Sequence, residues 1–597
     1  MASCFTSSLD HGLRCGLLAA SFFYASIGCA AEVVLDTIGL WRMYHVLSPP
    51  VVLVQGRPKT IEREAHLNWT TAAPPVGWMQ PDFDDGDWVR GPARRACQTP
   101  YLERLCLRGK FAVENPSAVR DLKLTVRYHG GVTVWVNGAE LTRRHLVPAA
   151  DGKSVASAEP YPAEAFSNAQ GKPLPSPEKL SASDADLQRR LALRLREITD
   201  VAIPASMLRR GVNVIAIEIV RAPYDAVHWV ENRTFRPDQV PYQISWYTCE
   251  ILQVRLAASD KSGLTPNVVR PPGFQVWNSP LLAGDFDLDF GDPNEPLRPL
   301  RIIGARNGAF SGKVMVGSTR PIRNLSATVS DLRSRSGDTI PANAVQVRYA
   351  MPWRTEQFHP QYLSGSRVSP YPAPASALAA LHEAPSAEIK VAMPGEPRNC
   401  LQLPGQPKPE GGAVVGVWAT VRVPAAARPG DYEGVLRIRA AGEKETPLSI
   451  QLRVADWTIP DPADWRNWTE FLQSPDTLAL EYGVKPWSEE HFALIGKSLR
   501  LLGEAGNRVL TIPLICGTHY GHEETMVRWR DRGGGNYDWD FTVMDRYLDT
   551  AERSMGRPAI VAFYVWDVFL IPADGGGGNW GKDDTDARGR ETRHQRV

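Results

Sequence analysis

The sequence predicts a multi-domain chain in which two β-sandwiches precede a segment of alternating strands and helices. At 597 residues the chain is too long for one hydrophobic core. Up to about residue 455, apolar and polar residues alternate in short runs bounded by Pro and Gly, which is typical of antiparallel strands. Beyond residue 460, continuous apolar runs alternate with stretches of helical spacing, which predicts a parallel sheet covered by helices.

The composition argues against one class of partner. Lys and Arg number 67 against 66 Asp and Glu, a formal net charge of +1. Because no excess of positive charge is available to neutralise a phosphate backbone, nucleic acid is not an expected partner. The chain also has 18 Trp, whose flat apolar rings suit both cores and sugar sites.

The N-terminus predicts export. Arg14 precedes an apolar run over 15–27, and small residues follow it. This pattern indicates a signal peptide over 1–31, and hence a secreted or periplasmic protein. A lipoprotein anchor at Cys29 is disfavoured because Ser26 stands where a Leu is expected. No later run approaches about 18 apolar residues, so no transmembrane segment is predicted.

Cysteine predicts no site. Five cysteines remain after residue 31: Cys97, Cys106, Cys249, Cys400 and Cys516. The first two are close enough in sequence to bridge a hairpin in an oxidising compartment, and equally can be free core residues. The odd number and scattered spacing argue against a disulfide framework and against zinc.

Residues 32–260 are expected to form the first β domain. Its alternating run 132–136 ends in Asn137-Gly138, the strongest short hairpin signal. The run 214–219 is apolar on both faces, which predicts a strand buried between two layers. Residues 145–183 are rich in Pro, Ala and Ser, and indicate an insertion or long loop.

Three segments of this domain carry a family resemblance: 83–88, 128–138 and 211–218. They resemble the jelly-roll, galactose-binding-like domain at the front of many β-galactosidase-like glycoside hydrolases. The resemblance implies a jelly-roll sandwich over 32–260. Such a module often supports a catalytic barrel without binding sugar, and support is the role we expect here, since fold alone does not assign function.

Two acidic clusters invite a calcium interpretation. They are Asp82, Asp84, Asp85 and Asp87, and then Asp285, Asp287 and Asp289. The first fails the EF-hand pattern, because Ala93 stands where the twelfth-position Glu is needed, and a solvated turn anchored by Trp88 is predicted instead. The second would place three carboxylates on one face of a strand, so a structural calcium ion is the only cofactor left open.

A linker over 261–299 and a second β-sandwich over 300–460 are expected next. The alternation at Val314 and Val316 and the turn at Pro429-Gly430 indicate antiparallel strands. The proline-stiffened stretch 457–462 forms the joint to the segment that follows.

Residues 461–597 read as a strand, helix, strand, helix, strand series. The expected elements are a strand at 468–472, a helix at 489–502 with Ser488 as N-cap, a strand at 508–515, a helix at 541–555 and a strand at 559–566.

This segment resembles the catalytic part of secreted bacterial proteins related to glycoside hydrolase family 123. The likeness is carried by 467–471, 538–547 and 563–567, together with 429–434 of the preceding sandwich. It implies a (β/α)₈ barrel of the TIM type. The residues from Trp465 to Val597 hold about three of its eight strands, so a partial barrel and a fragment of a longer protein are expected.

The resemblance also implies a retaining mechanism assisted by the acetamido group of the substrate. In that family one member of an adjacent Asp-Glu pair orients the acetamido group, and the other protonates the leaving oxygen. No Asp is followed directly by Glu anywhere in this sequence. Catalytic residues are therefore left unassigned.

Substrate-binding candidates are the polar residues after the three predicted strands. They are Glu470 after the first, His519 and Glu524 after the second, and Trp566 and Asp567 after the third. In a barrel, ligands meet the carboxyl ends of the strands. Trp566 can stack on a sugar and Asp567 can accept hydroxyl hydrogen bonds, although core packing for Trp566 and a simple loop position for His519 stay open.

Two functions follow from these observations. The first is the front portion of an exported glycoside hydrolase acting on extracellular polysaccharide, with N-acetyl-hexosaminide linkages as the implied target. The alternative is a non-catalytic carbohydrate-binding or surface-scaffold protein. In both, the partner is a polysaccharide or glycan, and the sequence predicts no oligomeric state.

Overall fold

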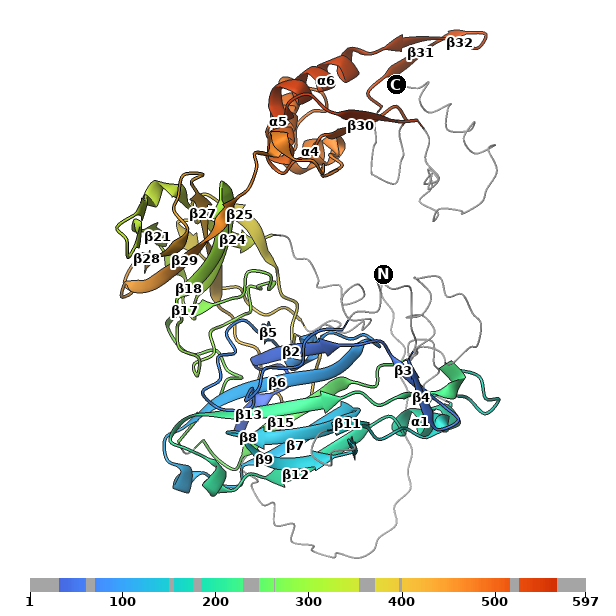
Figure 1. Ribbon diagram of the computed structural model, residues 1–597, viewed down its shortest axis with the longest axis vertical. Coiled ribbons are helices and arrows are strands. Elements are labelled where there is room, and N and C mark those ends of the chain that lie inside the picture. Colours follow the sequence, from blue (N-terminus) through green and yellow to red (C-terminus); the bar gives the residue numbers. More distant parts are fainter. Residues whose placement is uncertain are drawn as a thin grey trace, which may run out of the picture. The chain divides into compact units, whose positions relative to one another are not determined.

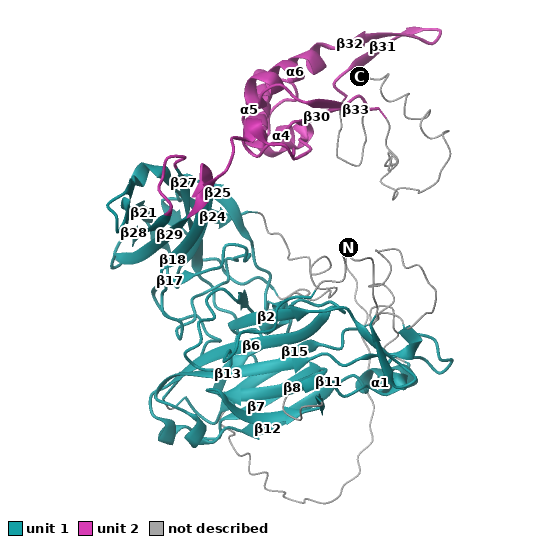
Figure 2. Cartoon of the chain, viewed as in Figure 1, with its two compact units in different colours: residues 1–304, 309–423, 430–454 teal, residues 305–308, 424–429, 455–597 magenta. Residues whose placement is uncertain are grey.

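The computed structural model describes residues 32–60, 70–149, 155–174, 184–228, 246–261, 263–353, 371–396, 400–515 and 525–565. The chain divides into two compact units (Figure 2): unit 1 is 1–304, 309–423 and 430–454, and unit 2 is 305–308, 424–429 and 455–597. The expected signal peptide, 1–31, lies outside the described residues. Within them, four α-helices stand among many strands, which confirms a β-rich, multi-domain chain. None of the helices described has the length and apolar character needed to cross a membrane.

The first β domain contains two antiparallel sheets (Figure 1). One has the order β1 (Glu32–Asp36), β15 (Glu250–Ala258), β7 (Lys123–His129), β12 (Arg196–Ala202). The other has the order β5 (Val89–Gly91), β2 (Trp41–Leu47), β6 (Leu102–Val113), β13 (Gly211–Val220), β8 (Gly131–Val136), β9 (Ala139–Arg144), with β16 (Leu264–Thr265) also on β6. Side chains from both sheets meet in one hydrophobic core.

Two local predictions in this domain are confirmed. Asn137 and Gly138 join β8 to β9, with φ of 51° and 83°, the positive values that a two-residue hairpin turn requires. β13 is buried on both faces, because Ile217 enters the main core while Ala216 packs with Trp78 and Trp88 on the other side. The loop that precedes β5 therefore forms a lid over that side of the sheet.

The predicted insertion has more structure than its composition indicates. It contains the paired strands β10 (Leu146–Pro148) and β11 (Val155–Ala158), and α1 (Ala185–Ala192) follows it. Tyr161 and Phe166 pack with Trp246 in a separate small core. Nearby, β3 (Val51–Val54) pairs with β4 (Arg57–Thr60) and with β14 (Tyr224–Asp225). The packing of these aromatic side chains stabilises this part of the chain, although its overall composition is rich in Ala and Pro.

The second β domain also has two sheets. The five-stranded sheet has the order β17 (Phe274–Asn278), β19 (Gly308–Ser318), β27 (Ala413–Val423), β24 (Val345–Pro352), β25 (Leu378–His382). The six-stranded sheet has the order β18 (Leu300–Arg306), β29 (Thr446–Thr458), β28 (Gly430–Arg439), β22 (Leu332–Ser334), β23 (Thr339–Ile340), with β21 (Ser326–Val329) also on β28. A further pair joins β20 (Ile322–Arg323) to β26 (Glu388–Ile389).

The stretch 261–299, expected to be a linker, contributes to both β domains. Its strand β16 pairs with β6, and β17 pairs with β19 in register from Phe274 to Asn278. Trp277 of β17 is buried in a core with Met315. These strands were not predicted from the sequence, because β16 and β17 are short and many prolines surround them.

Unit 2 contains the alternating part of the chain. Its elements are α4 (Pro475–Tyr482), α5 (Glu489–Glu504), β30 (Val509–Pro513), β31 (Arg528–Gly533), β32 (Asn536–Asp540), α6 (Thr542–Met555) and β33 (Ile560–Tyr564). β30 and β33 are parallel, as predicted. Ser488 caps α5, with its Oγ accepting from His491 N across 3.3 Å. Side chains of α5 and α6 pack with β30 in one core.

The barrel itself stays a prediction. In the described part of unit 2, the expected strand at 468–472 is reduced to a single parallel bridge between Thr469 and Asn507. Two parallel strands and one bridge form a short sheet edge and no closed barrel. The helix α4 and the antiparallel pair β31–β32 were not predicted from the sequence.

Candidate functional site

The carboxyl edge of β30 and β33 is the place where the predicted site residues should meet. The two strands run in register from Val509 opposite Ile560 to Pro513 opposite Tyr564, and Leu514 N donates to Tyr564 O across 3.0 Å. Both strands therefore end at the same level. In parallel β/α sheets this edge is where ligands bind.

Glu470 does not lie at that edge. Its neighbour Thr469 bridges Asn507, two residues before β30 begins, and Thr469 N donates to Gly506 O across 3.2 Å. At about 3.3 Å per residue, Val509 at the amino end of β30 is roughly 17 Å from Leu514. Glu470 is exposed, so no burial penalty demands a partner for its carboxylate. The strand expected at 468–472 therefore lies level with the amino end of β30, and Glu470 does not follow a strand that reaches the carboxyl edge.

The other four candidates, His519, Glu524, Trp566 and Asp567, lie outside the described residues. The described chain stops just short of them on both strands, at Ile515 and at Val565. Their assignment to the site remains a prediction.

A hairpin that the sequence analysis missed leaves from this edge. Met526 N donates to Pro513 O across 3.0 Å, which ties the start of the hairpin segment to the end of β30. At the other end, Asp540 Oδ1 accepts from Thr542 N and Oγ1 across 3.0 and 2.6 Å, at the start of α6. The run Gly533-Gly534-Gly535, with φ of 84°, 66° and 82°, makes the turn. Alternating residues on either side of this glycine run were the available signal.

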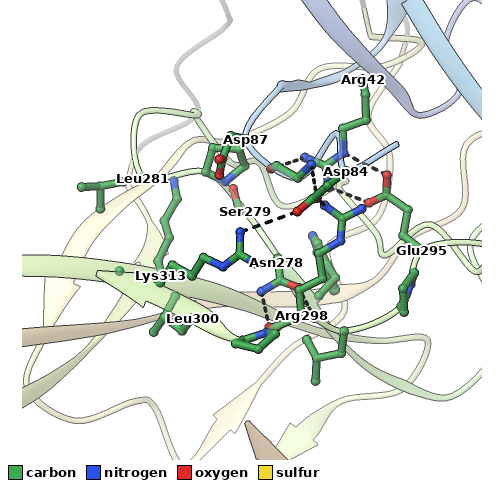
Figure 3. A pocket seen from close by; sticks show the side chains of 18 of the residues that line it. Arg42, Asp84, Asp87, Asn278, Ser279, Leu281, Glu295, Arg298, Leu300 and Lys313 are labelled. Atoms are coloured by element: carbon green, nitrogen blue, oxygen red, sulfur yellow. Dashed lines mark hydrogen bonds and ion pairs between the residues drawn. The ribbon is translucent and has the colours of Figure 1, made fainter. Parts of the chain in front are cut away.

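A separate pocket of about 270 Å³ lies in unit 1 (Figure 3). Its lining comes from five places in the sequence: Arg42 of β2, the loop around Asp84, β17 with the loop after it, the stretch from Glu295 to Arg301, and residues 311–313 of β19. Arg298 reaches Asp84 across 2.7 Å, and the Asn278 side chain bonds both the N–H and the carbonyl of Arg298.

Several charged side chains in and around this pocket are paired. Glu295 contacts Arg42 across 2.6 Å and Lys110 across 2.7 Å, and Lys313 contacts Asp285 across 2.6 Å. Burial alone would raise the pKa of Glu295, but Arg42 and Lys110 hold that pKa well below its ordinary value. A carboxyl that stays ionised cannot act as the general acid of a glycosidase at neutral pH. The neighbouring Asp292 differs, because burial and the charge of Glu295 raise the pKa of Asp292 to about 7. The ion pairs join the two β domains.

The acidic turn after Asp82 is only partly solvated. Trp88 is buried, as predicted, but Asp85 is buried too and contacts Arg108, Lys110 and Arg298 across 2.7, 2.8 and 3.1 Å. The expectation of a solvated turn was wrong for Asp85, because its cationic partners on β6 and beyond are distant in sequence.

The second acidic cluster is not on a regular strand. A single bridge at Phe286 interrupts a turn, and each carboxylate has a separate partner. Asp285 contacts Lys313, Asp287 accepts from Ser376 N across 2.8 Å, and Asp289 accepts from Phe286 N across 2.8 Å. In the described ranges no three His, Cys, Asp or Glu side chains gather as a metal site. Among the described cysteines, Cys97, Cys106 and Cys249 are free thiols.

Two family models match the chain in consecutive positions. The model of the glycoside hydrolase 123 N-terminal domain matches residues 301–440, and that of the glycoside hydrolase 123 catalytic domain matches residues 472–574. The first range falls on the second β domain and the second on the alternating segment of unit 2. The chain is therefore similar to family 123 glycoside hydrolases. No curated protein sequence matches it.

Among solved structures, a family 123 glycoside hydrolase from Clostridium perfringens, described in work on glycolipid glycan hydrolysis, is 18% identical, with a TM-score of 0.38. The match covers 48% of this chain and 46% of that one, so this chain corresponds to less than half of that relative. A PapD-like domain of human CEP192 is 10% identical over 32% of this chain and 91% of that domain, with a TM-score of 0.13.

Proposed function

We propose that this chain is an exported glycoside hydrolase-like protein that acts on glycans, with N-acetyl-hexosaminide linkages of extracellular polysaccharide as its target. The observation that carries the proposal is the order of the two family matches, an N-terminal-domain match followed by a catalytic-domain match. Export rests on the signal-peptide pattern of 1–31. In this proposal unit 2 contacts the glycan, and the two β domains of unit 1 support it.

The pairing within unit 1 supports this division of roles. Its buried carboxylates and cations neutralise one another around Glu295 and Asp85, and the pKa of each of these two carboxyls is lowered. In unit 2, Val565 is 63% exposed directly after β33. Trp566 and Asp567 follow Val565, so they are our first choice for glycan contact.

A second candidate function is glycan binding without hydrolysis. One observation favours it: the sequence has no Asp followed directly by Glu, the pair that family 123 chemistry uses. Binding needs only the aromatic and hydrogen-bonding groups at the edge, whereas hydrolysis also needs a general acid and a group that orients the acetamido oxygen.

The two candidates separate in one experiment with the full chain. Aryl N-acetyl-hexosaminides of both anomeric configurations are incubated with the protein and release of the phenol is followed, while a glycan array reports binding. Phenol release supports hydrolysis. Binding without release supports the second candidate. If the protein neither releases phenol nor binds any glycan, the proposal as a whole is overturned.

A set of variants then tests where the glycan lies. Asp567→Ala and Trp566→Ala are expected to weaken binding about tenfold, the loss of one good hydrogen bond or stacking contact. Glu470→Ala is the comparison, because its carboxylate is exposed at the amino end of β30 and binding should not change. Asp549→Ala, an exposed carboxylate on α6, is the matched control. If Glu470→Ala were the only variant that weakened binding, the glycan site would have to be assigned to the opposite edge of the sheet.

A further inference from the structure

The β31–β32 hairpin has two chemically different faces. Trp529 lies directly opposite Trp539, and Asp531 lies opposite Tyr537. Because side chains alternate along a strand, these four residues share one face. The rings touch: Trp529 and Trp539 have centroids 6.0 Å apart at 80°, and Trp529 and Tyr537 have centroids 5.7 Å apart.

The other face is charged and internally paired. Arg530 contacts Asp540 across 3.2 Å, and Arg532 contacts Asp538 at the turn end of the hairpin. These side chains are largely exposed, apart from the partly buried Asp540. Exposed ion pairs of this kind remain hydrated at little cost in free energy, so this is the face that the hairpin presents to solvent.

The aromatic face is not covered to the same degree as a core. Trp539 is 53% exposed, and its backbone is held on both sides by the hairpin register and by the Asp540 contacts with Thr542. A large indole kept in water at a fixed position forgoes the free energy that burial would give it, and such positions commonly mark binding surfaces. Trp529 packs nearly perpendicular to Trp539 and lies beside it.

We propose that the aromatic face of the β31–β32 hairpin is a stacking platform for one sugar ring of the glycan, with Trp539 as the surface on which the ring lies. This inference rests on the proposed function and adds a substrate contact to it. The hairpin leaves from the carboxyl end of β30, where Met526 N bonds Pro513 O, so the platform belongs to the same edge as the proposed site.

A sugar suits this surface better than a protein partner does. The C–H face of a pyranose is flat and apolar, and it matches a single indole, whereas a protein interface needs a wider apolar area. The platform also has an acceptor at its rim. Asp531 is exposed on the aromatic face, and its Oδ1 is oriented by Gly533 N across 2.6 Å. A carboxylate beside a flat ring can accept hydrogen bonds from sugar hydroxyls.

The test uses ligands without an aromatic aglycone, because an aryl group would itself stack on Trp539. Binding of the methyl glycosides and the β-linked disaccharides of N-acetylglucosamine and N-acetylgalactosamine to the full chain is measured by calorimetry and by saturation-transfer NMR. Trp539→Ala is expected to raise Kd at least fivefold and to reduce transfer to the ring C–H protons. Trp539→Tyr, which keeps a flat ring, should restore most of the affinity.

Trp457→Ala is the matched control, since Trp457 is 57% exposed at the end of β29, a strand that belongs to a different sheet from the hairpin. Circular dichroism and the thermal midpoint establish that each variant folds. Equal Kd values for the wild type and Trp539→Ala would overturn the platform while leaving the proposed function intact. An equal loss in Trp457→Ala would overturn it as well. A wild-type chain that binds none of these sugars and no array glycan would overturn both.

Discussion

Arg108 Nε donates to Asp85 Oδ2 across 2.7 Å, and neither side chain is exposed to solvent. Lys110 lies 2.8 Å from the other carboxylate oxygen, and Arg298 lies 3.1 Å from it. Burial alone would raise the pKa of Asp85, but Lys110 and Arg108 hold the pKa below its ordinary value, so the carboxyl stays ionised. The strand β6 and the stretch that leads into the second β domain are thus joined through one carboxylate.

Replacing Asp85 by Ala is expected to cost unit 1 about 3 to 5 kcal/mol, because it leaves Arg108 buried without its counter-charge. Urea unfolding followed by tryptophan fluorescence measures the change. Asp84→Ala is the control: the Asp84 side chain is 57% exposed and contacts Arg298 at the surface, so its loss should cost at most about 1 kcal/mol. Similar effects of both variants would contradict a dominant role for the buried pair.

Asp36 predicts a pH dependence of opposite sign to that of an ordinary ion pair. Its side chain is 2% exposed, and burial raises its pKa from 3.8 to about 6, against the lowering effect of the N–H groups of Ile38 and Thr37. The folded chain therefore binds this proton more tightly than the unfolded chain. Between pH 3.8 and about 6 the contribution of Asp36 to stability falls as pH rises, and it stays low above pH 6.

The Asp36→Asn variant removes this titration while keeping an acceptor for Ile38 N. We expect it to be more stable than the wild type at pH 7, by up to about 3 kcal/mol at 1.36 kcal/mol per pKa unit, and nearly equal at pH 4. Because all other groups titrate alike in both proteins, the difference between their urea unfolding curves isolates Asp36. A difference that does not change with pH would contradict the prediction.

Local signals account for what the sequence predicted well. The Asn137-Gly138 turn and the Ser488 cap each depend on residues within three positions of one another, and the structure has both. Asp85 shows the limit: its partner Arg298 is 213 positions away, so its burial could not be read from the turn around it. Long-range pairing, and not local propensity, decides such positions.

The candidate site shows the same division. Parallel strands at 509–513 and 560–564 were predictable from their apolar runs, whereas the level of Glu470 depends on one bridge to Asn507, which no periodicity reveals. The aromatic hairpin has alternating residues on both sides of Gly533, but helical spacing begins directly after it, so the alternating run is short. Charged residues on its outer face also lowered its apolar content.

The Ser488 cap predicts a measurable loss in unit 2. Ser488 Oγ satisfies His491 N at the start of α5, an N–H that has no carbonyl partner within the helix. Ser488→Ala should lower the stability of unit 2 by about 1 kcal/mol, while Ser488→Asp, which keeps an acceptor and adds a favourable charge at the helix start, should not. Hydrogen exchange of the α5 amides distinguishes the two. Equal protection in both variants would mean that tertiary packing alone fixes this end of the helix.

Gly130, between β7 and β8, cannot carry a side chain. Its φ is 107°, and an added Cβ would lie 2.3 Å from the carbonyl oxygen of Val220 and 2.8 Å from that of Thr248. Both obstacles are backbone atoms, so relief requires strands to move. Gly130→Ala is therefore expected to cost more than about 4 kcal/mol and to reduce the yield of folded protein.

Gly211 separates the two causes of that loss. Its φ of 91° is also positive, but an added Cβ there would meet nothing within 4 Å, so Gly211→Ala carries backbone strain without a clash. Strain of this kind costs about 1 to 3 kcal/mol. Thermal midpoints of the two variants should differ clearly, with Gly130→Ala the lower. Equal midpoints would mean that the β7–β8 connection yields to the added methyl group, and that the two carbonyls do not fix its position.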